Sequence, residues 1–426
     1  MTVYDLNGSP VAIYDTQGRA VLGAAAAPAP DPVAPPTPPD GPMLNIGTAL
    51  AAANNGAAPA GGTGGTLAVT RHTLTVDVLE ASVAWVTTYG YGFDVSGTYR
   101  AAVRVGDGPI LPVTVGGAGT WRIEKQSAWP VVTTSDPVRL NGYAGEQLLI
   151  YSWVASDGPG SVSADLIRLR AGEQTGTGEW GTAMNGLSDA ARDGAWSYRP
   201  ARVVAPSDQS SWLLVGDSIL QGHWSYPDRA TSARGLAAVK SAQGGEAHVF
   251  FPSRWNERCA PHVPTAPYMI DQYGVNSPGK MPVSGLAFWR HAKANGVKYL
   301  LKTTIAPTTL QGAATMSHAD AQLDNAWLRD GAPLTADKTT ALPTGTTDAT
   351  AVRCDVIRPD GTIKRGTGNG HPIDAVSDTA ARIEASPGYL SDEAAAVIGG
   401  DRLHPSPAVH AMLAERLARD LEILGY

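Results

Sequence analysis

The stretch Trp212-Leu213-Leu214-Val215-Gly216-Asp217-Ser218-Ile219 decides the fold of the second half of the chain. Its four leading apolar residues predict a strand that is covered on both faces, as the strands of parallel sheets are. Gly216 then permits a tight turn, and Ser218 falls where a helix begins, with its hydroxyl exposed and its backbone N–H free to stabilise an oxyanion. Reactive groups in open α/β sheets gather beyond the carboxyl ends of the strands, so Ser218 is a candidate catalytic residue.

The rest of the segment 209–426 alternates predicted strands with predicted helices. Further apolar runs predict strands at 248–251, 268–270 and 299–301, and helical patterns cover 284–295 and 318–329. A last helix opens with Ser406 as its N-cap and Pro407 at its first position. This alternation predicts an α/β domain with a largely parallel sheet.

A serine hydroxyl is a weak nucleophile unless a base takes its proton. Just before the last helix, Asp401-Arg402-Leu403-His404 supplies a histidine and a carboxylate three residues apart. At this spacing Asp401 can accept the Nδ1 proton of His404, which leaves Nε2 to face Ser218. We therefore predict Ser218, Asp401 and His404 as a catalytic set.

These residues resemble the motifs of the SGNH (GDSL) hydrolases over residues 209–426. Gly216-Asp217-Ser218 is similar to the first block of that family, Asp401-x-x-His404 to the last, and Tyr273-Gly274-Val275-Asn276 to the block between them. The resemblance implies a three-layer α/β/α fold and the hydrolysis of esters, including acetyl groups on polysaccharides. It also implies Ser218 as nucleophile, His404 as base, Asp401 as its orienting partner, and an oxyanion hole from Ser218, Gly274 and Asn276. Neither a metal nor an organic cofactor is implied.

Two departures from the family pattern bear on activity. Ser277 stands where the family usually has Asp after the Asn. The predicted second strand is followed by 251–257, which holds no glycine, although the family takes another oxyanion N–H there. Losing one oxyanion donor can lower a rate by about 10²–10³-fold. The alternative to an active esterase is therefore a member that keeps the fold without the activity.

Residues 66–170 carry short alternating strands with turns about every ten residues, which is typical of a β-sandwich or jelly roll. The segments 135–138 and 145–148 resemble jelly-roll modules attached to some SGNH esterases, and 171–208 reads as a connecting segment. This domain can bind carbohydrate through exposed aromatic rings, or the same rings can fill its core, which is the interpretation we favour. The rings in question are Trp85, Tyr89, Tyr91, Trp121 and Trp129.

The first 23 residues hold a period-ten repeat in which residues 3–12 are echoed by 13–22, and each copy predicts a small hairpin. Residues 24–65 follow as a proline-rich and then Gly/Ala-rich linker. A small hairpin pair on a spacer predicts an assembly peg that mounts the chain on a phage-like particle, as part of a homo-oligomer. The alternative is a hairpin folded back on its own chain.

Composition narrows the function classes further. The net charge of −7 argues against a nucleic-acid or anionic-membrane binder, and the sequence contains no apolar run long enough to span a membrane. Two cysteines, Cys259 and Cys354, exclude a disulfide scaffold and leave open whether they pair. No secretory signal is visible. We therefore expect an extracellular or virion-associated protein that is released with its particle by lysis of the cell, or else a cytoplasmic enzyme.

Two functions remain. One is a serine ester hydrolase that removes O-acetyl groups from a surface polysaccharide or other acylated glycan. The other is a non-catalytic spike or fibre that keeps the SGNH fold and binds a receptor or glycan. The glycine-rich segment 366–370 resembles a nucleotide loop, but it follows a turn instead of a buried strand and is interpreted as an ordinary loop.

Overall fold

The structure is a computed structural model of the chain. It describes residues 3–4, 10–11, 40–48, 50–51, 65–87, 93–124, 131–157, 161–162, 166–168, 173–189, 196–198, 200–221, 225–251, 253–307, 318–386, 389–397 and 403–426. The chain divides into two compact units, Met1–Pro36 and Thr37–Tyr426. In the first unit β1 (Val3–Tyr4) pairs antiparallel with β2 (Pro10–Val11), at the first copy of the repeat. The second predicted hairpin and the proline-rich part of the linker lie outside the described residues.

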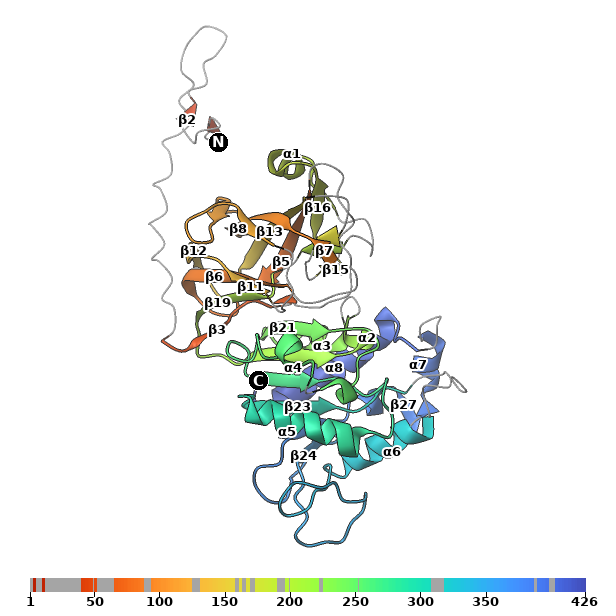
Figure 1. Ribbon diagram of the computed structural model, residues 1–426. Helices are drawn as coiled ribbons and strands as arrows, with labels where there is room; N and C mark the ends of the chain where they lie inside the picture. The colour runs from red at the N-terminus through yellow and green to blue at the C-terminus, as the bar shows by residue number, and fades with distance from the viewer. Residues whose placement is uncertain are drawn as a thin grey trace, which may run out of the picture. The chain divides into compact units, whose positions relative to one another are not determined.

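Two antiparallel sheets form the β-domain of the second unit, which is drawn in orange to olive in Figure 1. One sheet has the order β10 (Trp121–Ile123), β8 (Gly97–Val105), β13 (Gln147–Ser156), β5 (Thr66–Thr73), β16 (Gln174–Thr177), β17 (Ser188–Asp189), with β9 (Leu111–Val113) also on β8. The other has the order β11 (Val131–Thr134), β6 (Val78–Thr87), β19 (Arg202–Pro206), β3 (Met43–Asn45), with β12 (Val138–Gly142) also on β6. Smaller paired strands flank them: β7 (Phe93–Val95) with β14 (Ser161–Val162), and β15 (Leu166–Arg168) with β18 (Trp196–Tyr198).

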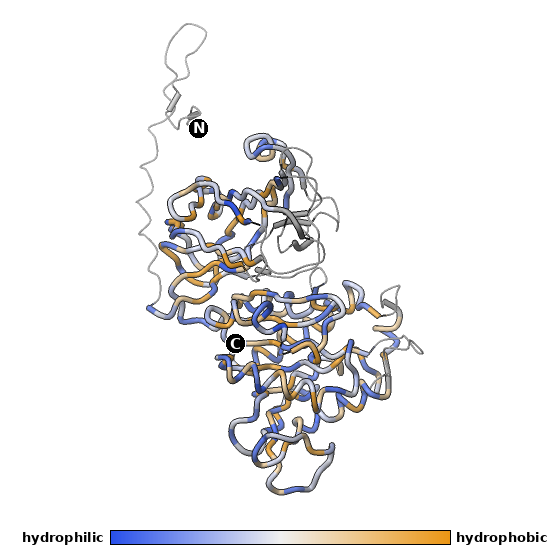
Figure 2. The backbone as a smooth tube through the Cα atoms, viewed as in Figure 1, coloured by the Kyte–Doolittle hydropathy of each residue, from blue (hydrophilic) through white to orange (hydrophobic). Residues whose placement is uncertain are grey.

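Large aromatic side chains fill the core of this sandwich. Trp85 is fully buried and donates its indole N–H to Ser152 Oγ at 3.1 Å, and its ring lies 5.3 Å from that of Trp121. Figure 2 shows hydrophobic residues along the strands of the sandwich. The interpretation of Trp85 and Trp121 as core residues is therefore confirmed. The other three candidate rings, Tyr89, Tyr91 and Trp129, lie outside the described residues.

The β-domain draws on more of the chain than the sequence indicates. Residues 43–45, predicted to be linker, form edge strand β3, which is anchored by the buried side chains of Leu44 and Ile46 on either side of its last residue. Within 171–208, predicted to be a connector, the chain forms β16, the short helix α1 (Trp180–Asn185), β17 and β19. β16 (Gln-Thr-Gly-Thr) and β17 (Ser-Asp) contain no apolar residue that would give a strand pattern in the sequence.

An eight-stranded sheet forms the core of the second domain. Its order is β25 (Ile363–Lys364), β24 (Asp355–Ile357), β26 (Ala375–Ser377), β23 (Tyr299–Thr303), β22 (Tyr268–Asp271), β20 (Ser211–Gly216), β21 (Ala237–Ala242), β4 (Leu50–Ala51). All neighbours in it run parallel except β24 and β25. β4 comes from the predicted linker, between strands β3 and β5 of the β-domain, and completes the edge of this sheet.

Helices cover both faces of the sheet (Figure 1). On one face α3 (Tyr226–Ala233) packs against α8 (Pro407–Ile423), and on the other α5 (Leu286–Ala294) packs against α6 (His318–Arg329). The domain also has three shorter helices, α2 (Ser218–Gln221), α4 (Trp255–Arg258) and α7 (Asp392–Val397). Single turns are present at η1 (His248–Phe250), η2 (Met281–Gly285) and η3 (Ala380–Arg382). A small hairpin is formed by β27 (Glu384–Ser386) and β28 (Tyr389–Leu390). These are the three layers that the resemblance implies. In the described part of the chain, no helix is long and apolar enough to cross a membrane.

The order of the strands places the switch point of the sheet beside β20. From β20 the chain moves outward to β21, then returns across β20 to β22 and continues the other way to β23. Open α/β sheets bind their ligands at this reversal, beyond the carboxyl ends of the strands. Ser218 comes two residues after the end of β20 and therefore lies there.

Most predicted elements of this domain are present, but the second strand is not where we predicted it. The strands at 212–215, 268–270 and 299–301 and the helices at 284–295, 318–329 and after Ser406 are confirmed. Residues 248–251, predicted as a strand, hold the single turn η1 instead. The second strand is β21, which is rich in alanine and carries Lys240, a residue that sequence patterns place on a surface. In the structure Lys240 is buried, because its amine donates to the buried Asp228 carboxylate at 2.7 Å.

Candidate active site

The carboxyl ends of three adjacent strands bring the candidate residues to one level. β20 pairs with β21 so that Gly216 lies opposite Ala242, and with β22 so that Val215 lies opposite Asp271. Ser218 comes two residues after Gly216, Gly244 two residues after Ala242 and Gly274 three residues after Asp271, so all three follow the carboxyl ends of adjacent strands. The nucleophile candidate thus lies between two glycine-containing loops.

The turn that carries Ser218 is fixed by its neighbours. A Cβ on Gly216 would lie 2.4 Å from Gln272 Oε1 and 2.7 Å from Leu220 Cβ, so a larger residue would push the turn away from β22. Asp217 is fully buried and its Oδ1 accepts the backbone N–H of Ile219 at 3.0 Å, which caps the first turn of α2. Burial raises the pKa of Asp217 to about 6. Ser218 itself is partly exposed, so a substrate can reach its hydroxyl.

His404 reaches this hydroxyl from the loop before α8. Its Nε2 lies 2.8 Å from Ser218 Oγ, although the two residues are 186 positions apart in the chain. The loop ends where the side chain of Ser406 accepts the backbone N–H of Val409 and starts α8, as predicted. The predicted contact between Ser218 and His404 is therefore present. Asp401, the predicted partner of the other ring nitrogen, lies outside the described residues.

The loop after β22 holds the candidate oxyanion donors. Gly274 has φ +152°, and a Cβ there would lie 2.6 Å from Ile305 Cγ1 and from Met281 Cε, so the loop requires glycine at this position. Two residues on, Asn276 donates its side-chain amide to the Glu246 carbonyl at 2.9 Å. An amide carries two hydrogens, so the same nitrogen can donate a second bond to a substrate oxygen.

The loop after β21 supplies the glycine that the sequence pattern did not reveal. Gln243, Gly244 and Gly245 follow the strand, and the Gly244 N–H donates to the side chain of Gln221 at the end of α2 at 2.9 Å. Our prediction that no glycine follows the second strand is wrong, because the strand was assigned eleven residues too late, to 248–251 in place of 237–242. The signal that could have found it is Gly244-Gly245 itself, which ends an alanine-rich segment.

Glu246 connects the two loops. Its backbone carbonyl accepts from Asn276, and its buried carboxylate accepts from Tyr273 Oη at 2.9 Å and lies 3.3 Å from Arg258 Nε. Asn276 is thus held by a residue whose own side chain is bonded to the loop that carries Gly274. This arrangement fixes the direction of the amide without a carboxylate at position 277, where the chain has Ser277.

A buried ionic cluster lies beneath the Gly274 loop. Lys302 on β23 donates its amine to the carbonyls of Asp271 at 3.1 Å and Tyr273 at 2.6 Å. The Asp271 carboxylate accepts from Trp289 Nε1 at 2.6 Å, from the backbone N–H of Tyr273 at 2.9 Å, and contacts His248 Nε2 at 2.8 Å. Burial acts to raise the pKa of Asp271, but the charges of Lys302 and His248 outweigh it and the pKa is lowered. Asp271 is therefore an ionised anchor for the loop.

Comparisons with known proteins add a likeness in structure and none in sequence. No protein-family model and no curated protein sequence matches the chain. A family two carbohydrate esterase from Cellvibrio japonicus is 11% identical, and the match covers 83% of this chain and 91% of that one, with a TM-score of 0.34.

Two further solved structures are similar to the same degree. A carbohydrate esterase family 2 enzyme with a carbohydrate-binding domain from Corynascus thermopiles is 13% identical over 90% of this chain and 99% of that one, with a TM-score of 0.33. A catalytic mutant of an acetylxylan esterase from Geobacillus stearothermophilus is 15% identical over 51% of this chain and 94% of that one, with a TM-score of 0.32. At such identities and TM-scores a likeness carries no functional argument, so the function is argued from the site.

Proposed function

We propose that the chain is a serine ester hydrolase that removes O-acetyl groups from a polysaccharide. The observation that carries this proposal is the 2.8 Å contact between Ser218 Oγ and His404 Nε2 at the switch point of the sheet. A serine next to an imidazole nitrogen, at a helix start and between two glycine-containing loops, has the parts that acyl transfer requires.

The geometry suggests the following steps. His404 Nε2 takes the proton of Ser218 as its Oγ attacks the acetyl carbonyl, and the oxyanion that forms is stabilised by the Ser218 N–H and the Asn276 amide. His404 then gives the proton to the sugar oxygen, which leaves as an alcohol, and the acetyl group stays on Ser218. Water, deprotonated by the same imidazole, attacks this acetyl-enzyme and releases acetate. Asp401 is the proposed acceptor for the Nδ1 proton of His404.

The test is hydrolysis of 4-nitrophenyl acetate and release of acetate from acetylated polysaccharides. Ser218→Ala should abolish both without changing the melting temperature, because Ser218 is only partly buried and its hydroxyl bonds to the partly buried His404. An organophosphate such as diethyl 4-nitrophenyl phosphate should add its phosphoryl mass to the wild type and not to Ser218→Ala. A wild-type protein that releases acetate from none of these esters would refute the proposal and favour the non-catalytic glycan-binding spike.

The mounting of this enzyme on a phage-like particle is a separate part of the proposal. Its support is the period-ten repeat, together with the division of the chain into a small unit, Met1–Pro36, and a large one. The proposal places the enzyme outside the cell, as a homo-oligomer at the end of a spacer. Deleting residues 1–23 should release the chain from the particle while leaving hydrolysis of 4-nitrophenyl acetate intact. Retention of the truncated chain in purified particles would contradict this.

A further inference from the structure

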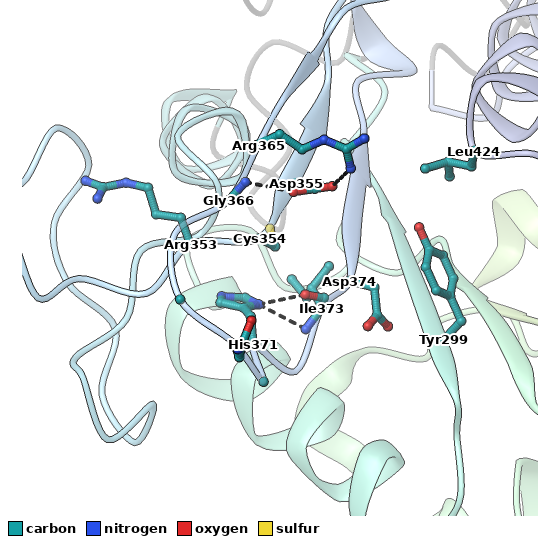
Figure 3. A pocket seen from close by; sticks show the side chains of 13 residues that line it. Tyr299, Arg353, Cys354, Asp355, Arg365, Gly366, His371, Ile373, Asp374 and Leu424 are labelled. Carbon is teal, nitrogen blue, oxygen red and sulfur yellow. Dashed lines mark hydrogen bonds and ion pairs between the residues drawn. The ribbon is translucent and has the colours of Figure 1, made fainter.

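A cavity opens at the opposite edge of the α/β sheet from Ser218. It has a volume of about 520 Å³ and is lined by the residues at which β23, β24 and β26 begin, among them Tyr299, Asp355 and Asp374 (Figure 3). In a parallel sheet all strands begin at one edge and end at the other, so this cavity lies about 15 Å from the catalytic edge, the length of a five-residue strand. The volume falls in the range of about 300–1,000 Å³ that is typical of small-molecule sites.

The charges that line the cavity cancel one another. Arg365 Nη1 contacts Asp355 Oδ2 at 2.6 Å, and Asp374 Oδ2 accepts from Lys293 Nζ at 2.5 Å. Arg353 lies 3.6 Å from Asp330, and burial lowers the pKa of His371 below its usual value, which keeps that ring neutral at pH 7. Among the residues that line the cavity, Arg353 and Arg365 balance Asp355 and Asp374, so the lining offers a charged ligand no net opposite charge. The cavity instead offers a dense set of hydrogen-bond donors and acceptors.

The rim of the cavity is built before any ligand arrives. Backbone bonds join Arg353 and Thr367 in both directions, at 3.0 and 3.1 Å, and Gly366 N donates to Asp355 Oδ1 at 2.7 Å. The loop from Gly366 to Gly370 carries little side-chain volume, so it leaves the opening wide and presents the exposed amide of Asn369. A fixed rim lowers the entropy lost on binding.

Aromatic rings lie beside this cavity. Tyr299 lines it, and the rings of Tyr268 and Tyr426 lie 6.3 and 5.6 Å from that of Tyr299. All three tyrosines are only partly buried, unlike Trp85 and Trp121 of the sandwich core. The three rings pack around the buried indole of Trp212, and their partly exposed surfaces combine apolar carbon with a polar hydroxyl, a combination that suits a sugar ring.

We propose that this cavity binds a neutral oligosaccharide segment and so holds the polymer while another part of it is deacetylated at Ser218. Sugar hydroxyls both donate and accept hydrogen bonds, so they can bind carboxylates and guanidinium groups that are already paired. Such paired groups offer no net charge to attract a charged ligand. The role in deacetylation rests on the proposed esterase function. The binding site itself does not.

The experiment uses the full chain with Ser218→Ala, so that no substrate is consumed. The probes are neutral hexasaccharides of β-1,4-linked xylose, mannose and glucose, with binding measured by isothermal titration calorimetry. The test variant adds Arg365→Ala and Asn369→Ala, both exposed residues of the rim. The matched control adds Arg122→Ala, which removes an exposed ion-paired arginine of the β-domain.

At least one hexasaccharide should bind the parent, and the rim variant should bind it about tenfold more weakly, while the control matches the parent. In the chain with Ser218 intact, the rim variant should raise KM for an acetylated polymer and leave hydrolysis of 4-nitrophenyl acetate unchanged. If none of the hexasaccharides binds, or if the rim variant binds as the parent does, the cavity is not a saccharide site, even with esterase activity present. If the rim variant loses binding but the chain with Ser218 intact hydrolyses no ester, the saccharide site is supported and the esterase function is refuted.

Discussion

Lys302→Met is the substitution that most directly tests how the Gly274 loop is held. The amine of Lys302 is fully buried, donates to the carbonyls of Asp271 and Tyr273, and lies 3.9 Å from Asp271 Oδ1. Removing one partner of a buried ion pair costs about 3–5 kcal/mol, because the other charge stays behind without compensation. The Asp271 carboxylate keeps its contacts with His248 Nε2 at 2.8 Å and Trp289 Nε1 at 2.6 Å. We therefore expect the low end, about 3 kcal/mol.

For a domain of this size, such a loss corresponds to a fall of about 6–12 °C in melting temperature, which differential scanning calorimetry can resolve. The same variant should lower kcat for 4-nitrophenyl acetate, because the Tyr273 carbonyl that it frees directly precedes Gly274. The fall should stay below the about 10²–10³-fold that follows the loss of a whole oxyanion donor, with KM changed less than kcat.

The double variant Lys302→Met/Asp271→Asn is the matched control, since it removes the stranded charge as well. Its melting temperature should lie above that of Lys302→Met, so that the two substitutions are strongly non-additive. Additive effects in this cycle, or a Lys302→Met protein that melts with the wild type, would refute the view that the pair anchors the loop.

Three further predictions concern single sites. Burial raises the pKa of Asp217 to about 6, so the native state binds its proton more tightly than the unfolded chain, and this contribution to stability is lost as pH rises from about 4 to 6. Asp217→Asn should therefore unfold at higher urea than the wild type at pH 7.5, by up to about 3 kcal/mol, and show no gain at pH 4. Gly274→Ala should destabilise the chain by about 1–3 kcal/mol in urea and lower kcat, because its Cβ would clash with Ile305. Cys259 and Cys354 are buried and free, so Ellman's reagent should react with no thiol in the native protein and with two thiols in guanidinium. If the two cysteines formed a disulfide, no thiol would react in guanidinium either.

The sequence predicts the parts of this fold whose burial is apolar. The run before Gly216, the helix capped by Ser406, and the contact between Ser218 and His404 all follow from patterns that depend on local chemistry. The sequence does not predict short elements that are stabilised mainly by pairing with distant strands. β3 and β4 are examples: each has two or three residues and pairs with a strand more than 150 positions away.

The second strand escaped for a different reason, and that reason bears on the site. Lys240 on β21 and Lys302 on β23 both lie inside the sheet, and each is held by a buried carboxylate. Periodicity treats a lysine as a surface residue, because burying it unpaired would be costly. The partner of Lys240, Asp228, comes from α3, so the ion pair that permits burial of the lysine can be identified only from the structure.

The two buried lysines lie on either side of the catalytic strand β20: Lys240 on β21, the strand that leads to Gly244, and Lys302 on β23, which pairs with the strand that leads to Gly274. A purely apolar sheet would be at least as stable, since buried ion pairs are often no better than well-packed hydrophobic residues. What Lys302 adds is direction: hydrogen bonds fix the carbonyls of the Gly274 loop in a way that apolar contacts do not. Catalysis by oxyanion stabilisation depends on such fixed dipoles, because donors that need not reorganise stabilise developing charge most. Polar groups inside this sheet are therefore expected to matter more for kcat than their effect on stability alone indicates.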